Sequence, residues 1–345
     1  MINNPTKLLF MFTLMGGTII SISANSWFGA WIGLEINLLS FIPLMTYTTN
    51  SMSSEASLKY FLTQALASAT LLFSVIFAAL IFSLPNTLLT LNPFLNSLIA
   101  SSLLLKMGAA PFHFWFPGVM EGINWMNGFM LMTWQKIAPL MLLSYNLSLN
   151  TFSTLVIILS ILIGSLGGLN QTSLRKILAY SSINHIGWLI AALVLQENIW
   201  NIYFVTYLLF LTATIIIMLH LNSISHINQT FSLNSIEPII KFSLFTSLLS
   251  LGGLPPFLGF LPKWIVIQNL ASSGMMFTVT VMVTTTLITL FYYLRVSFSA
   301  FMLSYSETLW CNPIPKLSGP ILWPITLTAV STLGLPISSL IFHLF

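Results

Sequence analysis

Four ionisable residues lie in the middle of long apolar stretches of the sequence: Glu35, Lys106, Lys136 and Lys263. Only 5% of the 345 residues are charged, and none of them is aspartate. A charged side chain at the centre of a membrane helix costs roughly 2.5–3.5 kcal/mol on insertion scales. Buried lysine and glutamate can take up and release protons, because burial disfavours the charged form and a nearby opposite charge favours it. We therefore predict that these residues carry protons or small cations and catalyse no covalent chemistry.

Two of the lysines lie beside clusters of glycine and proline. Lys106 opens the run KMGAAPFHFW, which contains Gly108 and Pro111, and Lys263 lies near the end of GGLPPFLGFLPKW at 252–264. Proline removes a backbone donor from a helix and clashes with the preceding turn. The carbonyl groups freed at such a break need protein or water partners at membrane depth. Both runs are predicted to be broken helices, although the spacing alone also allows a loop position for Lys263.

Glu35 and Lys136 complete the predicted set. Glu35 is the only acidic residue at this depth beside three cations, so an ion pair with one of them is the economical interpretation. A protonated, purely structural glutamate is the alternative. Gln135, next to Lys136, is a second polar side chain but points to a different face of the helix.

Two histidines are weaker candidates for a proton path. His185 follows Ser181 by four residues, so both lie on one helix face, although close packing of small residues explains this spacing equally well. His113 lies inside the first glycine–proline cluster. Glu55 and Lys59 are also four residues apart, and we interpret them as a solvated pair at a helix end.

The composition is that of an integral membrane protein, with 57% hydrophobic residues and a mean hydropathy of +0.95. The cations are scattered singly, which argues against nucleic acid as a partner. Cys311 is the only cysteine, which excludes a disulfide within the chain and a cluster ligated by several cysteines. Neither a metal-ligand spacing nor a phosphate-binding glycine motif is present. We expect no metal or cofactor to be bound by this chain.

Eleven apolar stretches are long enough to be transmembrane helices. Their approximate bounds are 8–24, 26–47, 57–83, 94–117, 124–145, 151–169, 173–195, 200–221, 238–271, 276–303 and 321–344. If these helices alternate in direction, seven basic residues lie on the N-terminal side and none on the other. This asymmetry predicts that the N-terminus faces the cytoplasm or the mitochondrial matrix.

The order of the helices predicts two inverted units within one transmembrane domain, 1–345. Residues 8–145 and 151–303 would each hold five helices with the fourth one broken, and 321–344 would be an extra helix. Similarity between individual residues of the two units is not evident. Paired broken helices in inverted repeats are typical of a transport site near the membrane midplane. The predicted fold is therefore all-α, with helices 4 and 9 discontinuous.

The runs at 106–115 and 252–264, together with WIGLEIN at 31–37, resemble the antiporter-like membrane subunits of respiratory complex I. The resemblance extends over the whole chain and is strongest to a short, insect-like animal form that lacks the first helices of the family. It implies that Glu35 is the buried glutamate of the family and Lys136 its central lysine. Lys106 and Lys263 would be the lysines of its two broken helices.

The resemblance also implies a function, a location and partners. The function is proton translocation driven by NADH oxidation and ubiquinone reduction in other subunits, which would hold NAD, FMN, iron–sulfur clusters and ubiquinone. The partners would be neighbouring antiporter-like subunits and lipids such as cardiolipin. The location would be the mitochondrial inner membrane, with the N-terminus in the matrix, the C-terminus towards the intermembrane space, and synthesis inside the organelle.

Two alternatives remain open from the residues alone. A free-standing cation/proton antiporter would need the same buried charges. A structural membrane subunit would use its lysines only for ion pairs between helices.

Overall fold

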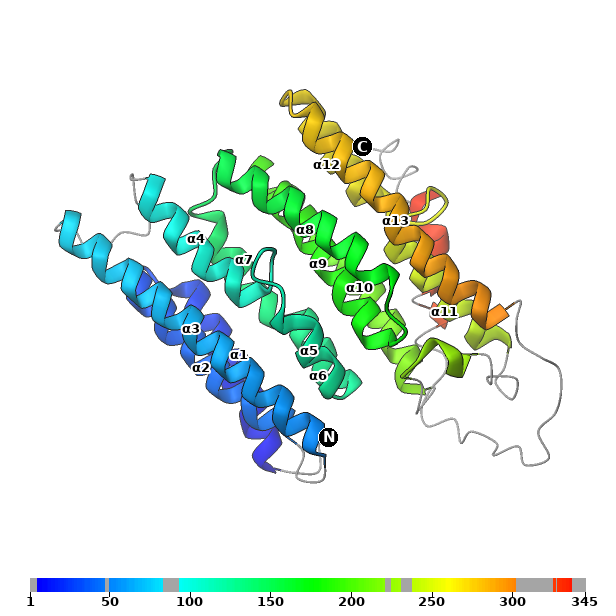
Figure 1. Cartoon of the computed structure of the whole chain (residues 1–345), viewed down its shortest axis with the longest axis horizontal. Coiled ribbons are helices and arrows are strands. Elements are labelled where there is room, and N and C mark those ends of the chain that lie inside the picture. Colours follow the sequence, from blue (N-terminus) through cyan, green and yellow to red (C-terminus); the bar gives the residue numbers. More distant parts are fainter. Residues whose placement is uncertain are drawn as a thin grey trace. The chain divides into compact units, whose positions relative to one another are not determined.

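The computed structural model describes residues 5–46, 50–82, 93–220, 225–230, 238–301, 325–326 and 328–336, and this part is built from helices (Figure 1). In chain order the α-helices are α1 (Pro5–Ser23), α2 (Trp27–Met45), α3 (Ser51–Phe82), α4 (Pro93–Met107), α5 (Trp115–Gly122), α6 (Trp125–Met132), α7 (Trp134–Ser144), α8 (Thr151–Leu169), α9 (Leu174–Leu195), α10 (Glu197–His220), α11 (Pro238–Gly252), α12 (Phe260–Ser272) and α13 (Met276–Phe301). A short 3-10 helix, η1 (Ile227–Thr230), lies between α10 and α11. Cys311 and most of the predicted last helix lie outside the described residues.

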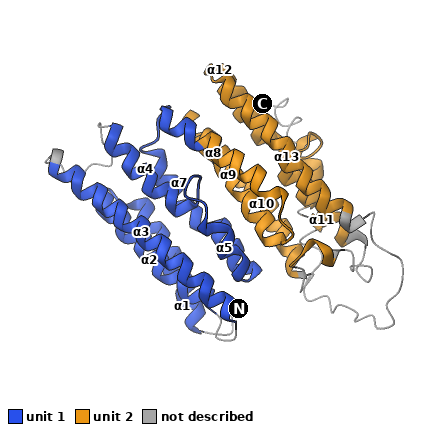
Figure 2. Cartoon of the chain, viewed as in Figure 1, with its two compact units in different colours: residues 1–156 blue, residues 157–345 orange. Residues whose placement is uncertain are grey.

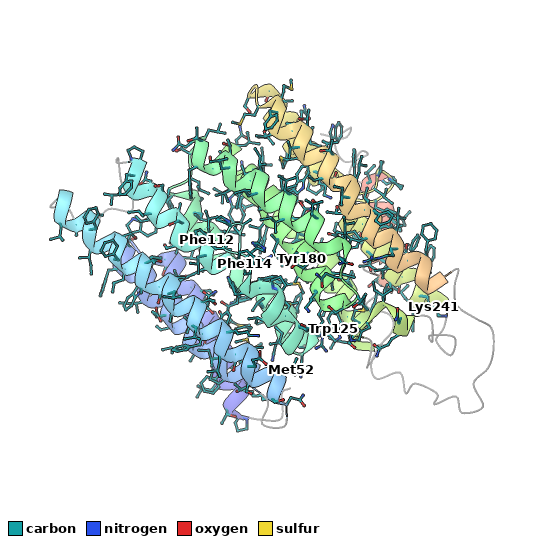
Figure 3. All side chains as sticks on the ribbon, viewed as in Figure 1. Met52, Phe112, Phe114, Trp125, Tyr180 and Lys241 are labelled. Atoms are coloured by element: carbon teal, nitrogen blue, oxygen red, sulfur yellow. The ribbon has the colours of Figure 1, made fainter. Side chains whose placement is uncertain are left out.

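The described helices have the length and composition of membrane spans. Seven of them, α1, α2, α3, α8, α9, α10 and α13, are long and apolar enough to cross a membrane, and α4 and α11 are shorter apolar helices. On α3, Leu62, Leu66 and Phe73 are each more than 60% exposed, and side chains cover the outer faces of the helices (Figure 3). Such exposed apolar side chains suit contact with lipid or a partner. The all-α integral membrane class is confirmed, whereas the number of eleven helices stays a prediction.

The chain divides into two compact units, residues 1–156 and residues 157–345 (Figure 2). In unit 1, residues 1–156, α1 packs along α2, and α3 packs against α2, α4 and α5. Helix α7 contacts α1, α2 and α4. The packing of unit 1 therefore brings together the helices that carry Glu35, Lys106 and Lys136.

Unit 2, residues 157–345, encloses helix α9. Helices α10 and α12 pack against α9, and α11 packs against α10 and α13. Of the most apolar stretch of 18 residues in α9, 89% is buried inside the protein. The polar side chains of Ser181, Asn184 and His185 consequently lie in the interior of unit 2.

Three of the predicted helices are interrupted. The stretch at 94–117 divides into α4 and α5, and the stretch at 238–271 divides into α11 and α12, as the glycine–proline clusters predict. The stretch at 124–145 was predicted as one helix, but α6 and α7 meet at Thr133.

The junction at Thr133 lies beside two local features. The Thr133 hydroxyl donates to the Phe129 carbonyl at 2.7 Å, and Pro139 inside α7 has no amide hydrogen to donate to the Gln135 carbonyl four residues earlier. Lys136 therefore lies in the first turn of α7 and not near the centre of a continuous helix.

Candidate functional site

The first break follows α4 and is shaped by Gly108. Its φ of 75° lies in the left-handed region that glycine adopts without strain. The Ala109 amide donates to the Leu104 carbonyl at 3.1 Å, and the Gly108 amide donates to the Leu105 carbonyl at 3.2 Å. This pair of hydrogen bonds is the Schellman motif, which ends a helix sharply. Helix α4 thus stops one residue after Lys106.

Neutral side chains bond the carbonyl groups next to this break. The Trp115 indole donates to the Leu105 carbonyl at 3.2 Å, and the Gln64 amide of α3 donates to the Lys106 carbonyl at 3.2 Å. Helix C-terminal carbonyls left without donors at membrane depth are costly. Both donors therefore stabilise the end of α4 without using the Lys106 ammonium.

Lys106 itself is buried and interacts with Glu35. Its side chain is 7% exposed in the last turn of α4, where the partial negative charge of the helix end favours a cation. An electrostatic interaction links Lys106 to Glu35 of α2, but no ion pair within 4.0 Å joins these two described residues. Glu35 is only partly buried. The two groups are near enough to interact, yet they do not form a contact ion pair.

Lys136 lies close to the first break through an aromatic side chain. It is 1% exposed, and its Nζ atom lies 5.6 Å from the centre of the Phe116 ring. Phe116 follows the break, and a Cβ atom added to Gly108 would lie 3.2 Å from the Cβ atom of Phe116. Ammonium groups are attracted to the faces of aromatic rings. Unit 1 therefore brings Lys136, Phe116 and the end of α4 into one site.

The second break, after α11, uses the same backbone motif. Gly253 has a φ of 77°. The Leu254 amide donates to the Leu249 carbonyl at 3.4 Å, and the Gly253 amide donates to the Ser250 carbonyl at 3.0 Å. Helix α11 thus ends in a Schellman motif like that of α4.

Lys263 bonds to the end of α11. Its Nζ atom donates to the Gly252 carbonyl at 2.7 Å and lies 5.7 Å from the centre of the Trp188 ring. The side chain is 5% exposed. Lys263 is therefore a buried residue of the break, not a residue of an exposed loop.

The two breaks correspond residue by residue. The Phe112 amide donates to the Ala109 carbonyl at 2.8 Å, and at the same offset from Gly253 the Phe257 amide donates to the Leu254 carbonyl at 2.9 Å. With the breaks aligned in this way, residues 108–117 and 253–262 share the pattern G-x-x-P-F-x-x-x-x-P. The pattern becomes recognisable once the two glycines of positive φ are aligned. The Ala110–Pro111 peptide bond of the first break is cis.

His185 belongs to a buried aromatic group in unit 2. Its Nδ1 atom lies 2.9 Å from the Tyr203 hydroxyl, and its ring centre lies 4.9 Å from that of Tyr207. The Trp188 ring stacks on Tyr203 at 6.4 Å and also faces Lys263. The structure therefore connects His185 to Lys263 through Tyr203 and Trp188.

His113 lies within the first break, whereas the pair Glu55–Lys59 lies apart from both breaks at the start of α3. The His113 Nδ1 atom lies 3.3 Å from the Pro111 carbonyl, and its ring contacts Phe114, whose side chain is seen at the first break (Figure 3). Lys59 and Glu55 are 2.6 Å apart, with side chains 54% and 59% exposed, as the spacing predicts.

Several residues of the site carry no clear signal in the sequence. Gln64, Trp115 and Tyr203 become recognisable only when their partners on other helices are known. A buried glutamine in an apolar stretch is the one available signal, since amides at that depth need a partner. Within the described ranges, no group of three or more His, Cys, Asp or Glu side chains is placed to hold a metal ion.

Comparison with known families covers nearly the whole chain. Residues 24–289 match the family described as NADH:quinone oxidoreductase/Mrp antiporter, transmembrane region, and residues 290–342 match the NADH dehydrogenase subunit 2 C-terminus. NADH-ubiquinone oxidoreductase chain 2 of Anopheles gambiae is 58% identical over 303 residues, which are 88% of each chain. Chain 2 of Aedes aegypti is 55% identical over 97% of each chain, and that of Pongo abelii is 41% identical over 95% of this chain and 96% of the relative.

Solved structures have the same fold. A chain of respiratory complex I from Thermus thermophilus with bound Aureothin superposes with a TM-score of 0.83 at 24% identity, over 97% of this chain and 79% of that one. A chain of the Mrp complex from Dietzia sp. DQ12-45-1b superposes with a TM-score of 0.80 at 18% identity, over 96% of this chain and 75% of that one.

Proposed function

The chain belongs to the NADH:quinone oxidoreductase/Mrp antiporter family and, within it, to chain 2 of NADH–ubiquinone oxidoreductase, and on that premise we propose that Glu35, Lys106, Lys136 and Lys263 carry protons across the membrane. It is a membrane subunit of proton-translocating complex I. Membership of that complex favours the translocating subunit over a free-standing antiporter.

The contact between Lys263 and the Gly252 carbonyl is the observation that carries this proposal. A carbonyl at a helix C-terminus stabilises a cation, both as a hydrogen-bond acceptor and through the helix dipole. A lysine at a helix break can change this contact when the break moves slightly, because the backbone there is not held by the regular helical bonds. Such a movement would alternately favour the charged and the neutral lysine, which is what a proton carrier needs.

In unit 1, Lys106 would also alternate between a charged and a neutral form, with the carboxylate of Glu35 as its partner in place of a backbone carbonyl. Lys106 interacts with Glu35 at a distance greater than that of a contact ion pair. A shorter separation would favour the charged form of Lys106 and a longer one would disfavour it, because a nearby opposite charge stabilises the ammonium group. Lys136, buried against Phe116, would exchange protons with this pair. His113 and His185 are proposed as secondary members of the path.

The remaining parts of the proposal concern the surroundings of the chain. Redox chemistry, with NAD, FMN, iron–sulfur clusters and ubiquinone, would take place in other subunits of the complex. Neighbouring antiporter-like subunits and lipids such as cardiolipin would contact this chain. The relatives and the apolar helices fit a multi-pass protein of the mitochondrial inner membrane. We propose that its N-terminus lies in the matrix and that it is synthesised inside the organelle.

Replacing Lys136 by methionine tests the proposal in the assembled complex. Methionine retains much of the apolar volume but cannot bind a proton. Coupled proton pumping should therefore fall about tenfold, which corresponds to an activation barrier higher by roughly 1.4 kcal/mol. Lys59→Met is the matched control, because it removes a lysine from an exposed ion pair, and it should pump normally. Unchanged pumping by an assembled Lys136→Met complex would contradict the relay and favour a purely structural role.

A further inference from the structure

The side chain of Gln135 joins three helices of unit 1. Its Nε2 atom donates to the Asn37 side-chain carbonyl at 2.8 Å, and its Oε1 atom accepts from the Tyr60 hydroxyl at 3.5 Å. Asn37 belongs to α2, Tyr60 to α3 and Gln135 to α7. The helix that carries Glu35 is therefore bonded directly to the helix that carries Lys136.

Helix α3 extends this connection to the first break. Gln64 lies one turn after Tyr60, so both side chains face the same way. The Gln64 amide donates to the backbone carbonyl of Lys106 at 3.2 Å. The Tyr60 ring packs edge-on against Trp115 at 5.8 Å, and Trp115 donates to the carbonyl of Leu105. One face of α3 thus holds the end of α4.

These polar side chains are buried or nearly so. Asn37 and Tyr60 are each 2% exposed and Gln64 is 4% exposed, while Gln135 is partly buried. A buried amide without a partner is destabilising, whereas an apolar side chain of the same shape is tolerated well. Packing alone therefore does not require amides at these positions. Amides are required where hydrogen bonds hold the helices at fixed distances.

Three of these four residues are each close to a proposed proton carrier, and the fourth, Tyr60, bonds to Gln135. Asn37 is two residues from Glu35, Gln135 is adjacent to Lys136, and Gln64 binds the backbone of Lys106 itself. Amides and a tyrosine hydroxyl fix distances without adding a charge. Because the interaction between two charges depends on their separation and is strong where water is excluded, fixed distances determine how the carriers exchange protons.

We propose that Asn37, Tyr60, Gln64 and Gln135 form a polar frame of positioning residues that sets the separations among Glu35, Lys106 and Lys136. The inference rests on the proposed function, since it assigns to the frame the geometry of those carriers. The frame residues act through the carriers and do not themselves carry protons.

Exchanging the two amides tests the frame. Asn37→Gln lengthens one side chain and Gln135→Asn shortens the other, so each single change disturbs the bond, while the double change restores the combined length. In the assembled complex, each single variant should shift the pH profile of proton pumping and lower coupled turnover about tenfold, since a misplacement of about 1 Å costs up to about 10²-fold in rate. The double variant should recover both.

Asn127→Leu is the matched control. Asn127 is an equally buried amide of unit 1, 3% exposed, and it donates to the Leu44 carbonyl at 2.7 Å outside the frame. Its loss should lower thermal stability and leave the pH profile unchanged. A shift of the profile in Asn127→Leu as large as in the single amide variants would overturn the inference.

Two milder variants keep the test decisive if the exchanged amides prevent assembly. Tyr60→Phe removes only a hydroxyl, and Gln64→Met removes only the donor to the Lys106 carbonyl. Gln64→Met should shift the pH profile, and Tyr60→Phe should do so less, because its contact is longer. If both pump with the normal profile while Lys136→Met shows the expected loss of pumping, the frame is refuted and the proton relay stands. If Lys136→Met also pumps normally, the relay itself fails.

Discussion

The two broken helices end in the same backbone motif and differ in the side chains that bond the carbonyl groups beside the break. After α4, two neutral donors, Gln64 and Trp115, bond the carbonyls beside the break. After α11, the ammonium of Lys263 bonds the last carbonyl of the helix. The lysine precedes the glycine in the first break and follows it in the second.

This difference separates the ways in which the two lysines are stabilised. The Lys106 ammonium is not needed by the backbone and interacts with a carboxylate on another helix. The Lys263 ammonium is part of the helix end itself. The first lysine therefore responds to the ionisation and distance of Glu35, whereas the second responds to the geometry of its own break. One backbone motif thus supports two kinds of lysine site.

Methionine at the two lysine positions should give the largest difference. Lys263→Met leaves the Gly252 carbonyl without its donor, and an unpaired buried acceptor costs about 1–3 kcal/mol. Lys106→Met keeps both neutral donors and removes a buried charge, so its stability should change little. Thermal unfolding of the two variant complexes measures this. Equal losses of stability would show that the breaks are not stabilised differently.

Alanine at the two glycines should give a smaller difference. Both positions have a positive φ, which costs about 1–2 kcal/mol for a residue with a Cβ atom. At Gly253 the new Cβ atom would also lie 2.9 Å from the Lys263 side chain, whereas at Gly108 it would meet Phe116. Both variants should lose stability, but only Gly253→Ala displaces a proton carrier directly.

Proton pumping per electron pair, measured in assembled complexes of both alanine variants, separates these effects. Gly253→Ala should pump less than Gly108→Ala at similar thermal stability. The opposite order would mean that Phe116, and with it Lys136, depends on the first break more than Lys263 depends on the second.

Glu55→Gln should have the smallest effect. The carboxylate belongs to an exposed ion pair at the start of α3, and exposed pairs contribute little because water and salt screen them. Thermal stability and pumping should both equal those of the unchanged chain. A clear loss of pumping would show that the carriers extend beyond the two breaks and the residues around them.

The class of the protein and its breaks were predictable from sequence, because both depend on local properties. Long apolar runs suit only helices in lipid, and the glycine–proline clusters interrupt them wherever they fold. The junction at Thr133 was not predicted, since threonine is compatible with a helix and the same hydroxyl bond at Thr285 leaves α13 unbroken. The interior position of Lys263 was also undecided, because depth within a broken helix depends on how the chain continues after the break.

The sequence by itself determined which residues carry charge into the membrane and where two helices must break, because the cost of a buried charge and the missing donor of proline are properties of single residues. Only the tertiary structure decided what each of those residues contacts. The bond of Lys263 to Gly252, the neutral donors of the first break and the link from Gln135 to Asn37 all join atoms that are distant along the chain or separated by an irregular turn. Their geometry depends on helix packing, in which distance, direction and burial are set by many residues together.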